Sequence, residues 1–560
     1  MELVFLSRNT HTIPGLMPKI KSSKLIFPKF YFVLILISCS FFEISYGQNH
    51  EIRYNSIDVL DYKFEIALND STDQIEGNAT IQIFFKIALE KFTLDLKNIN
   101  DKGQGMIIEE VSEDRNSVRF IHQNDQIEIS CKSTNIGEIK IFHIKYHGIP
   151  DDGLIITTNK FGDRVFFADC WPNRAHHWLP TVDHPSDKAT VEFIVKAPSH
   201  YQVVANGTNI EETNIGDEII SHWKTEVPLP TKVMVIGVAQ FAKQNLPDFE
   251  GIPISTWVYP QNREEGFSDY DATNGPLAFY TTHIAAYPFS KMASVQSKTV
   301  FGGMENASCI FYAERTVTGK RKPESLFAHE IAHQWFGDAV SELNWHHIWL
   351  SEGFATYFTS LYLEYQQGRD EFVNSMKNQR KRIIDYSKKN LAPVIDTSQI
   401  VSIDLLNTNS YQKGGWFLHM LRNELGDELF WKCIRTYYKK FEYRNALTED
   451  FQEVVESISG KDFDYFFKQW LYKSGQPQLK STWDYDGKMI KFKLTQLQKQ
   501  YIFRFPLELK IINADKTSST ETISVNNAKE TFLIISDKRP KNIILDPNTK
   551  LLFETIDIDN

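Results

Sequence analysis

Cysteine is scarce in this sequence, and the few cysteines form no recognisable pattern. The chain of 560 residues contains five cysteines. Four lie far apart along the chain, without the close pairs that bind structural zinc. These four are Cys131, Cys170, Cys309 and Cys433. A disulfide framework is therefore not indicated, and we expect free, buried thiols.

Long low-complexity runs, internal repeats and an excess of positive charge are also missing. With 42% hydrophobic and 13% aromatic residues, the composition predicts globular structure. The formal net charge is −10. Residues 1–47 carry five basic and two acidic side chains, so a chain that begins at Gln48 would carry −13. Because nucleic-acid-binding proteins present a basic face, we expect no nucleic-acid partner.

The apolar run near the N-terminus is too short to cross a bilayer. It covers thirteen residues, Phe30–Phe42, and follows four lysines, whereas a spanning helix needs about 20 apolar residues. Small residues precede Gln48 at the positions typical of a signal-peptidase site. We therefore predict a signal peptide over residues 1–47, an exported protein that is periplasmic or secreted, and no membrane span in the mature chain.

A second interpretation of the N-terminus remains open. Leu36-Ile37-Ser38-Cys39 resembles a bacterial lipobox. Cleavage there would leave a lipid anchor on Cys39 and tether the protein to a membrane. The leader could also stay uncleaved, and initiation at Met17 would give a leader of more usual length.

The sequence does contain the pattern H-E-x-x-H, followed after eighteen residues by a glutamate. On a helix, residues four apart face the same side, so the imidazoles of His329 and His333 can bind one metal ion. Catalytic zinc takes three protein ligands and leaves a position for water. We therefore expect one Zn²⁺ per chain, with Glu352 as third ligand and Glu330 as general base. Taken alone, the short pattern also fits a helix with two surface histidines.

Three further segments occur in a fixed order around this pattern. They are Gly302-Gly303-Met304-Glu305-Asn306, Trp349-Leu350-Ser351-Glu352-Gly353-Phe354-Ala355 and Tyr411-Gln412-Lys413-Gly414. Together with H-E-x-x-H they resemble the motifs of the M1 family of gluzincin metallopeptidases. That family includes alanyl- and leucyl-type aminopeptidases and a leukotriene-type epoxide hydrolase. The resemblance runs from about residue 50 to the C-terminus and is densest between 295 and 425.

The resemblance implies a role for each motif. His329, His333 and Glu352 would bind zinc, and Glu330 would be the general base. The segment Gly302, Gly303, Met304 and Glu305 would bind substrate, with Glu305 on the free α-amine. Such a carboxylate–ammonium pair is charge-assisted, and a blocked N-terminus does not form it. Glycines let a peptide backbone approach closely. Tyr411 would donate to the oxyanion that develops during attack.

The chain departs from the family pattern at three positions. Ser351 replaces the common asparagine before the ligand glutamate, and Asp338 stands where asparagine is frequent. Both could orient the metal ligands through hydrogen bonds. By the resemblance, Trp171 stands at the position where relatives have a glutamine or glutamate near the substrate amine. The shape of the first specificity pocket is therefore not predicted. His346 and His347 are adjacent and diverge in direction, so neither is expected to be a ligand.

The expected fold class is multidomain α+β. Strand patterns dominate residues 48–245, which the resemblance makes a β-rich N-terminal domain. Residues 246–475 favour helices, among them buried ones over 327–338, 352–365 and 416–425, as in a thermolysin-like, mostly α catalytic domain. Residues 478–560 return to strands and predict a small β-sandwich-like domain.

The leading prediction is a zinc aminopeptidase that acts on peptides with a free N-terminus, as a monomer or a homodimer. Three alternatives remain: an endopeptidase, an epoxide hydrolase of the leukotriene type, and a catalytically silent binding protein. Glu305 argues against an endopeptidase, since it would anchor an α-amine. The full set of ligands, base and tyrosine argues against a silent protein.

Overall fold

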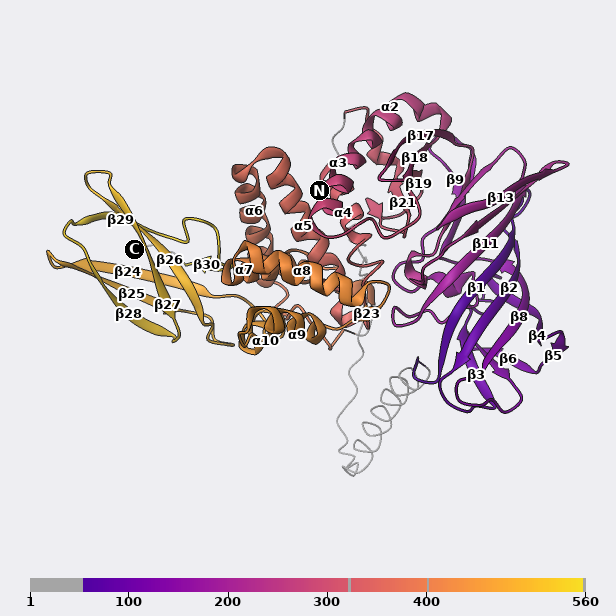
Figure 1. The fold of residues 1–560 in the computed structure, drawn as a ribbon, viewed down its shortest axis with the longest axis horizontal. Coiled ribbons are helices and arrows are strands. Elements are labelled where there is room, and N and C mark those ends of the chain that lie inside the picture. Colours follow the sequence, from indigo (N-terminus) through magenta and orange to yellow (C-terminus); the bar gives the residue numbers. More distant parts are fainter. Residues whose placement is uncertain (1–53, 321–323, 400–401, 557–560) are drawn as a thin grey trace, which may run out of the picture. The chain divides into compact units, whose positions relative to one another are not determined.

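The computed structural model describes residues 54–320, 324–399 and 402–556. The predicted leader over 1–47, including Cys39, lies outside these residues. The described part begins with β-strands, continues with helices and ends with β-strands, which confirms the expected multidomain α+β class (Figure 1). Among the described residues, no helix has both the length and the apolar character needed to cross a membrane.

A nine-stranded sheet forms the first layer, in the order β13-β14-β11-β1-β2-β8-β4-β5, with β15 paired to β11. Its strands are β1 (Ile57–Ala67), β2 (Ile75–Phe85), β4 (Gly105–Glu113), β5 (Asn116–Ser117), β8 (Ile139–Ile149), β11 (Lys188–Pro198), β13 (Thr208–Ile215), β14 (Glu218–Lys224) and β15 (Leu229–Pro230). Alternate residues of β1 and β2 are buried. The period of two therefore gives the sheet one apolar face and one polar face.

Two smaller sheets accompany it, in the orders β3-β7-β6 and β12-β16-β10-β9. Their strands are β3 (Lys91–Asp95), β6 (Phe120–Gln123), β7 (Gln126–Ser130), β9 (Leu154–Thr158), β10 (Arg164–Ala168), β12 (Gln202–Ala205) and β16 (Ile236–Ala239). Phe166 and Phe167 of β10 and Val238 of β16 are fully or almost fully buried. These strands therefore contribute buried side chains to the hydrophobic core.

A five-stranded sheet, ordered β17-β18-β19-β21-β20, precedes the helices. It comprises β17 (Ala242–Phe249), β18 (Ile252–Val258), β19 (Met292–Ser297), β20 (Gly303–Met304) and β21 (Cys309–Ala313), with α2 (Arg263–Tyr270) and α3 (Asn274–His283) between β18 and β19. Strand β20 is the edge strand and pairs antiparallel with β21. The predicted substrate segment therefore lies on an open sheet edge.

The remaining helices form one packed group: α4 (Glu324–His333), α5 (Trp349–Gln367), α6 (Arg369–Ser387), α7 (Gly414–Leu425), α8 (Asp427–Phe441), α9 (Thr448–Ser459) and α10 (Asp464–Leu471). A two-stranded ladder of β22 (Ser341–Glu342) and β23 (Asn445–Ala446) joins two of their connections. The prediction that the first buried helix extends to residue 338 is wrong, since α4 ends at His333. Gln334 and Trp335 donate to carbonyls only three residues back, and Gly337 has φ +131°, so the chain turns away.

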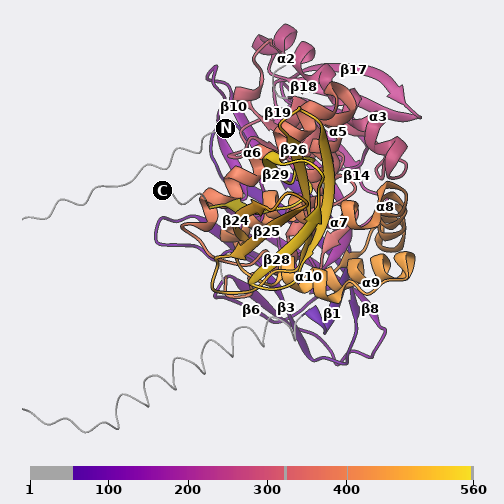
Figure 2. The same cartoon turned by 90° about the vertical axis from the view of Figure 1, so that its left-hand side faces the viewer.

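The C-terminal region consists of two sheets, ordered β28-β25-β24-β30 and β27-β26-β29. The strands are β24 (Gln478–Tyr485), β25 (Met489–Gln496), β26 (Phe505–Asn513), β27 (Ser518–Val525), β28 (Lys529–Ile535), β29 (Pro540–Leu545) and β30 (Glu554–Thr555). They can be followed in yellow in Figure 2. Strands β25 and β26 each bury alternate residues, so each sheet has one apolar face.

Candidate metal centre and substrate site

Helices α4 and α5 bring the three predicted metal ligands together. His329 Nε2 and His333 Nε2 lie 3.2 Å apart, and Glu352 Oε2 lies 3.4 Å from the first and 3.3 Å from the second. His333 and Glu352 are buried, while His329 keeps about a fifth of its side chain exposed. The centre is therefore open on the His329 side.

These distances fit a zinc ion. Ligand atoms placed about 2.0–2.1 Å from a tetrahedral metal are about 3.3–3.4 Å apart, and the three atoms here are 3.2–3.4 Å apart. Two imidazoles and one carboxylate are also the donor set of many catalytic zinc sites. The residues present therefore suit zinc.

Hydrogen bonds fix the orientation of His333. Its Nδ1 lies 3.1 Å from the carbonyl oxygen of Phe336 and 3.0 Å from Ser351 Oγ. Because a carbonyl only accepts, Nδ1 carries the proton and Nε2 is free to bind metal. Ser351, one of the departures from the family pattern, thus contacts a ligand directly.

Glu330 fills a space that exists because residue 303 is glycine. A Cβ at Gly303 would lie 2.5 Å from Cγ and from Oε1 of Glu330. The glycine is therefore needed to admit the side chain of the predicted base. At Gly302 a Cβ would meet only ordinary contacts of 3.6 Å or more, so the protein's own packing requires a glycine only at position 303. Burial raises the pKa of Glu330 well above its usual range, which suits a proton acceptor.

Glu305 lies close to both Glu330 and His333. One oxygen of Glu305, one of Glu330 and a ring nitrogen of His333 all lie within 4.8 Å of one another. Glu305 is 3% exposed, and among the described residues its Oε1 has no hydrogen-bond partner. An unpartnered buried carboxylate oxygen is costly, so it is available for a cation. Met304 is buried and pairs with Phe311 in the β20–β21 ladder, which holds the residue before Glu305.

Tyr411 approaches from a π-helical turn, Asn409–Lys413. Its ring stacks against His329 with centroids 5.9 Å apart. The turn can come this close because Gly353 of α5 and Gly414 of α7 meet backbone to backbone, and a Cβ on Gly353 would lie 3.0 Å from Gly414. Short π-helical segments often mark functional sites. Burial and the Glu352 carboxylate raise the pKa of Tyr411, so the phenol keeps its proton.

Comparison with protein families places this chain in a known family. A model described as the peptidase family M1 domain matches residues 269–470, and one described as the peptidase M1 N-terminal domain matches residues 58–233. The chain belongs to peptidase family M1. All nine predicted site residues lie in the first of these ranges.

Relatives of this M1 peptidase carry aminopeptidase names. It is 27% identical to "Probable aminopeptidase 2" of Sulfurisphaera tokodaii over 74% of this chain and 51% of the relative. It is also 27% identical to glutamyl aminopeptidase of Sus scrofa, over 56% of this chain and 35% of the relative. The chain thus spans about a third to a half of the length of these two relatives.

A solved structure shares the fold. It is the crystal structure of Legionella pneumophila aminopeptidase A in complex with aspartic acid, with a TM-score of 0.78 at 16% identity. The match covers 90% of this chain and 60% of that chain. The arrangement of β-rich N-terminal region, helical region and C-terminal sheets is therefore that of an M1 aminopeptidase fold.

An aromatic cluster lies beside the substrate segment of this M1 peptidase. Trp171 is buried, with its ring 6.4 Å from Phe301 and 5.4 Å from Trp345. His346 and His347 have other partners: His346 contacts the carbonyl of Gln399, and His347 contacts Thr448. Trp171 thus forms part of an apolar wall next to the segment that begins at Gly302.

Sequence reasoning missed two buried groups near the centre. Lys232 and Glu342, each about 1% exposed or less, pair at 2.6 Å, and Lys232 lies 5.6 Å from the Trp345 ring centroid. Gln334 is fully buried and makes four hydrogen bonds. A lysine at the start of an apolar stretch and a glutamine next to a motif histidine were signals, but neither residue has a motif of its own.

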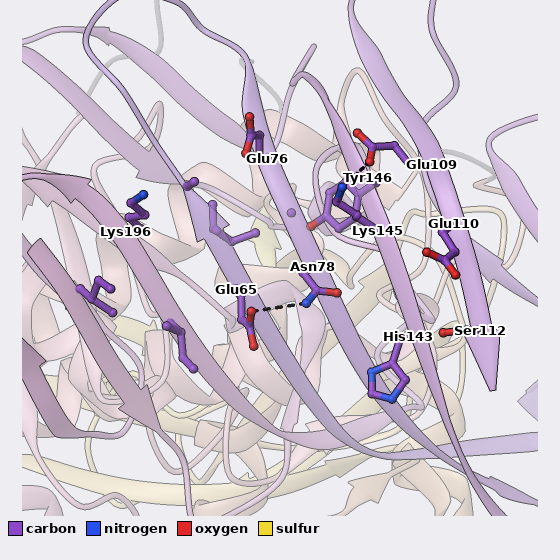
Figure 3. A pocket seen from close by; sticks show the side chains of 15 residues that line it. Glu65, Glu76, Asn78, Glu109, Glu110, Ser112, His143, Lys145, Tyr146 and Lys196 are labelled. Atoms are coloured by element: carbon purple, nitrogen blue, oxygen red, sulfur yellow. Dashed lines mark hydrogen bonds and ion pairs between the residues drawn. The ribbon is translucent and has the colours of Figure 1, made fainter. Parts of the chain in front are cut away.

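A separate cavity lies on the N-terminal sheet. It has about 500 Å³ and opens on the polar face of the nine-stranded sheet, between β1, β2, β8 and β4 (Figure 3). Its labelled side chains include Glu65, Glu109 and Lys145, and none of the predicted site residues line it. Because its charged groups are exposed, we expect the chemistry at the buried centre instead.

Proposed function

We propose that this protein is a zinc-dependent aminopeptidase that hydrolyses the first peptide bond of peptides with a free N-terminus. The observation that carries the proposal is the triangle of His329, His333 and Glu352 ligand atoms, 3.2–3.4 Å on each side. Two buried carboxylates, Glu305 and Glu330, flank it. The names of the relatives agree with this activity.

The chemistry would be divided among the residues of the site. Zinc held by His329, His333 and Glu352 would polarise the scissile carbonyl and make a bound water acidic. Glu330 would accept the proton of the attacking water on a carboxylate oxygen and pass it to the leaving amine. The Tyr411 hydroxyl would donate to the carbonyl oxygen as negative charge develops.

Glu305 would decide which bond is cut. Its free oxygen would pair with the α-ammonium of the substrate in a buried, charge-assisted contact. Since an acetylated N-terminus has no positive charge, it would leave the Glu305 oxygen unpaired. This requirement separates an aminopeptidase from an endopeptidase.

Turnover of a fluorogenic peptide tests the proposal. The free and N-acetylated forms of one peptide should be compared, each with and without a chelator. We expect cleavage of the free form alone, abolished by the chelator and restored by Zn²⁺. Cleavage of both forms would indicate an endopeptidase, and cleavage of neither would contradict the proposal.

We also propose that the protein is exported, on the basis of the leader in residues 1–47. N-terminal sequencing of the protein from its host would distinguish cleavage before Gln48 from lipidation of Cys39. A chain that retains its leader in the cytoplasm would contradict export. The same preparation, analysed by light scattering, would distinguish a monomer from a homodimer.

A further inference from the structure

The turn that carries Glu305 has an unfavourable backbone conformation. Ser308, three residues later, has φ +62°, in the left-handed region that costs free energy for any residue with a side chain. Strain of this kind persists only where the surroundings enforce it, and it is frequent at functional sites. The contacts of Ser308 therefore indicate what holds this turn.

Ser308 is held by every polar group that it has. Its N–H donates to Gln334 Oε1 at 2.8 Å, and its carbonyl accepts from Ala293 N at 3.0 Å. Its hydroxyl oxygen accepts from Gly207 N at 2.9 Å and from Lys291 Nζ at 3.3 Å. The turn is thus tied to three separate parts of the fold.

Gln334 links both ends of this turn to the metal helix. Its Nε2 donates to the carbonyl of Glu305 at 2.6 Å, while its Oε1 accepts from the N–H of Ser308. A backbone carbonyl only accepts and a backbone N–H only donates, so these two bonds fix which way the amide faces. Tyr287 donates to the same Oε1 at 3.0 Å, and Asp338 Oδ2 accepts from Nε2 at 2.9 Å.

We propose that Gln334 is the positioning residue that sets Glu305 at the distance from the metal centre required to bind a substrate α-amine. Gln334 directly follows His333, and its side chain spans the turn from Glu305 to Ser308. Any shift of the turn relative to the metal helix therefore breaks at least one of its hydrogen bonds. The inference rests on the proposed function, because it assumes that Glu305 binds the amine.

Gln469 offers a matched control. It is 1% exposed, and it also spans a backbone carbonyl and N–H: its Nε2 donates to Arg504 O at 2.9 Å and its Oε1 accepts from Arg504 N at 2.7 Å. Tyr465 donates to the same oxygen. It joins α10 to the C-terminal sheets, so its loss should affect stability without affecting the amine site.

The test measures binding in the Glu330→Gln background, where turnover does not interfere. Calorimetry would give the Kd of Ala-Phe amide and of its N-acetyl form for the zinc-loaded parent, Gln334→Met and Gln469→Met. We expect Gln334→Met to weaken binding of the free amine about tenfold or more, since small misplacements of this kind cost up to a hundredfold. Gln334→Met should bind the acetylated form with a Kd within about twofold of the parent. Gln469→Met should bind both peptide forms with Kd values within about twofold of the parent.

A double-mutant cycle makes the inference specific. If Gln334 acts through Glu305, Gln334→Met should change little in a chain that already carries Glu305→Ala. Additive losses would overturn the inference, and so would loss of zinc from Gln334→Met, because the glutamine would then act on the metal. If Gln334→Met does not fold, Gln334→Glu keeps the size and the acceptor for Ser308, removes the donor to Glu305, and carries the same expectation.

The outcomes separate this inference from the proposed function. Turnover of the wild-type chain decides the function, and the difference in amine affinity decides the role of Gln334. An active enzyme whose Gln334→Met variant binds the free amine as tightly as the parent would overturn the inference alone. A parent that binds both peptide forms equally would overturn the amine role of Glu305 and the inference with it.

Discussion

Two groups of carboxylates in the described part of this molecule differ in burial. At the metal centre, Glu305, Glu330 and Glu352 are 3–4% exposed and converge on two histidines. On the polar face of the nine-stranded sheet, the side chains of Glu65 and Glu109 are about 40% exposed and line an open cavity of about 500 Å³.

The difference lies in what surrounds each charge. Glu109 forms pairs with Lys145 at 2.7 Å and His147 at 2.8 Å, and water screens such exposed pairs, so each contributes little. At the centre, low dielectric strengthens every interaction and makes each unpaired group costly. The convergence of buried charged groups therefore supports the metal centre as the site of the proposed chemistry.

The sharpest way to test this comparison is to remove one carboxylate from each place. Glu330→Gln should lower kcat/KM by about 10²–10⁴-fold, the usual contribution of a general base, while the circular dichroism spectrum and zinc content stay unchanged. The same substitution at Glu110, on the sheet face, should leave kcat/KM unchanged. Equal losses of kcat/KM in the two variants would contradict the claim that only the buried carboxylates take part in the reaction.

The buried Lys232–Glu342 pair should have a large effect on the free energy of unfolding. Lys232→Met leaves Glu342 buried and unpaired, so we expect a loss of about 3–5 kcal/mol in the free energy of unfolding. Because a buried pair can be replaced by apolar side chains at little cost, Lys232→Met with Glu342→Leu should recover most of this loss. Urea denaturation of the three chains measures both values. No recovery in the double variant would contradict the electrostatic explanation.

A pH titration extends the comparison to a third buried group, His419 of α7, which contacts Thr549 O at 2.8 Å. Burial lowers the pKa of His419 to about 3. Below pH 6.5 the unfolded chain therefore binds a proton that the folded chain does not. Stability should fall by a few kcal/mol as pH drops from about 6.5 to about 3. Unfolding midpoints measured across this pH range test the prediction. In His419→Gln the midpoint should depend less on pH than in the parent chain. An unchanged pH dependence would show that His419 does not cause the loss of stability.

Glu305→Ala tests the amine anchor by itself. A hydrogen bond to a charged group contributes about 1.5–3 kcal/mol, so kcat/KM for a free N-terminus should fall roughly ten- to hundredfold, with most of the change in KM. Glu305→Gln should recover only part of it. Unchanged selectivity between free and acetylated peptides would remove Glu305 from this role.

The smallest effect is expected on the sheet face. Lys145→Met breaks the exposed pair with Glu109 and should leave both kcat/KM and the unfolding midpoint nearly unchanged. Thermal unfolding and a peptide assay measure the two quantities. A marked loss of either would show that the sheet face contributes more than its exposure indicates.

Much of the centre could be predicted because its residues are close in sequence. His329, Glu330 and His333 lie within two helical turns, so spacing alone brings the two imidazoles together. The end of α4 at His333 was not predicted, because a turn built on Gly337 competes with an apolar pattern that continues to residue 338. The long-range pairings were also out of reach, such as β1 lying parallel to β11.

The sequence by itself determined the donor set, the order of the motifs and the alternation of strands, helices and strands, because these depend on residue types and local periodicity. Only the tertiary structure decided that Gly303 admits Glu330, that Gly353 and Gly414 bring Tyr411 to His329, and that Gln334 spans the turn of Glu305. These contacts join residues up to 82 positions apart, from His329 to Tyr411. They depend on close packing between elements, which local periodicity does not encode.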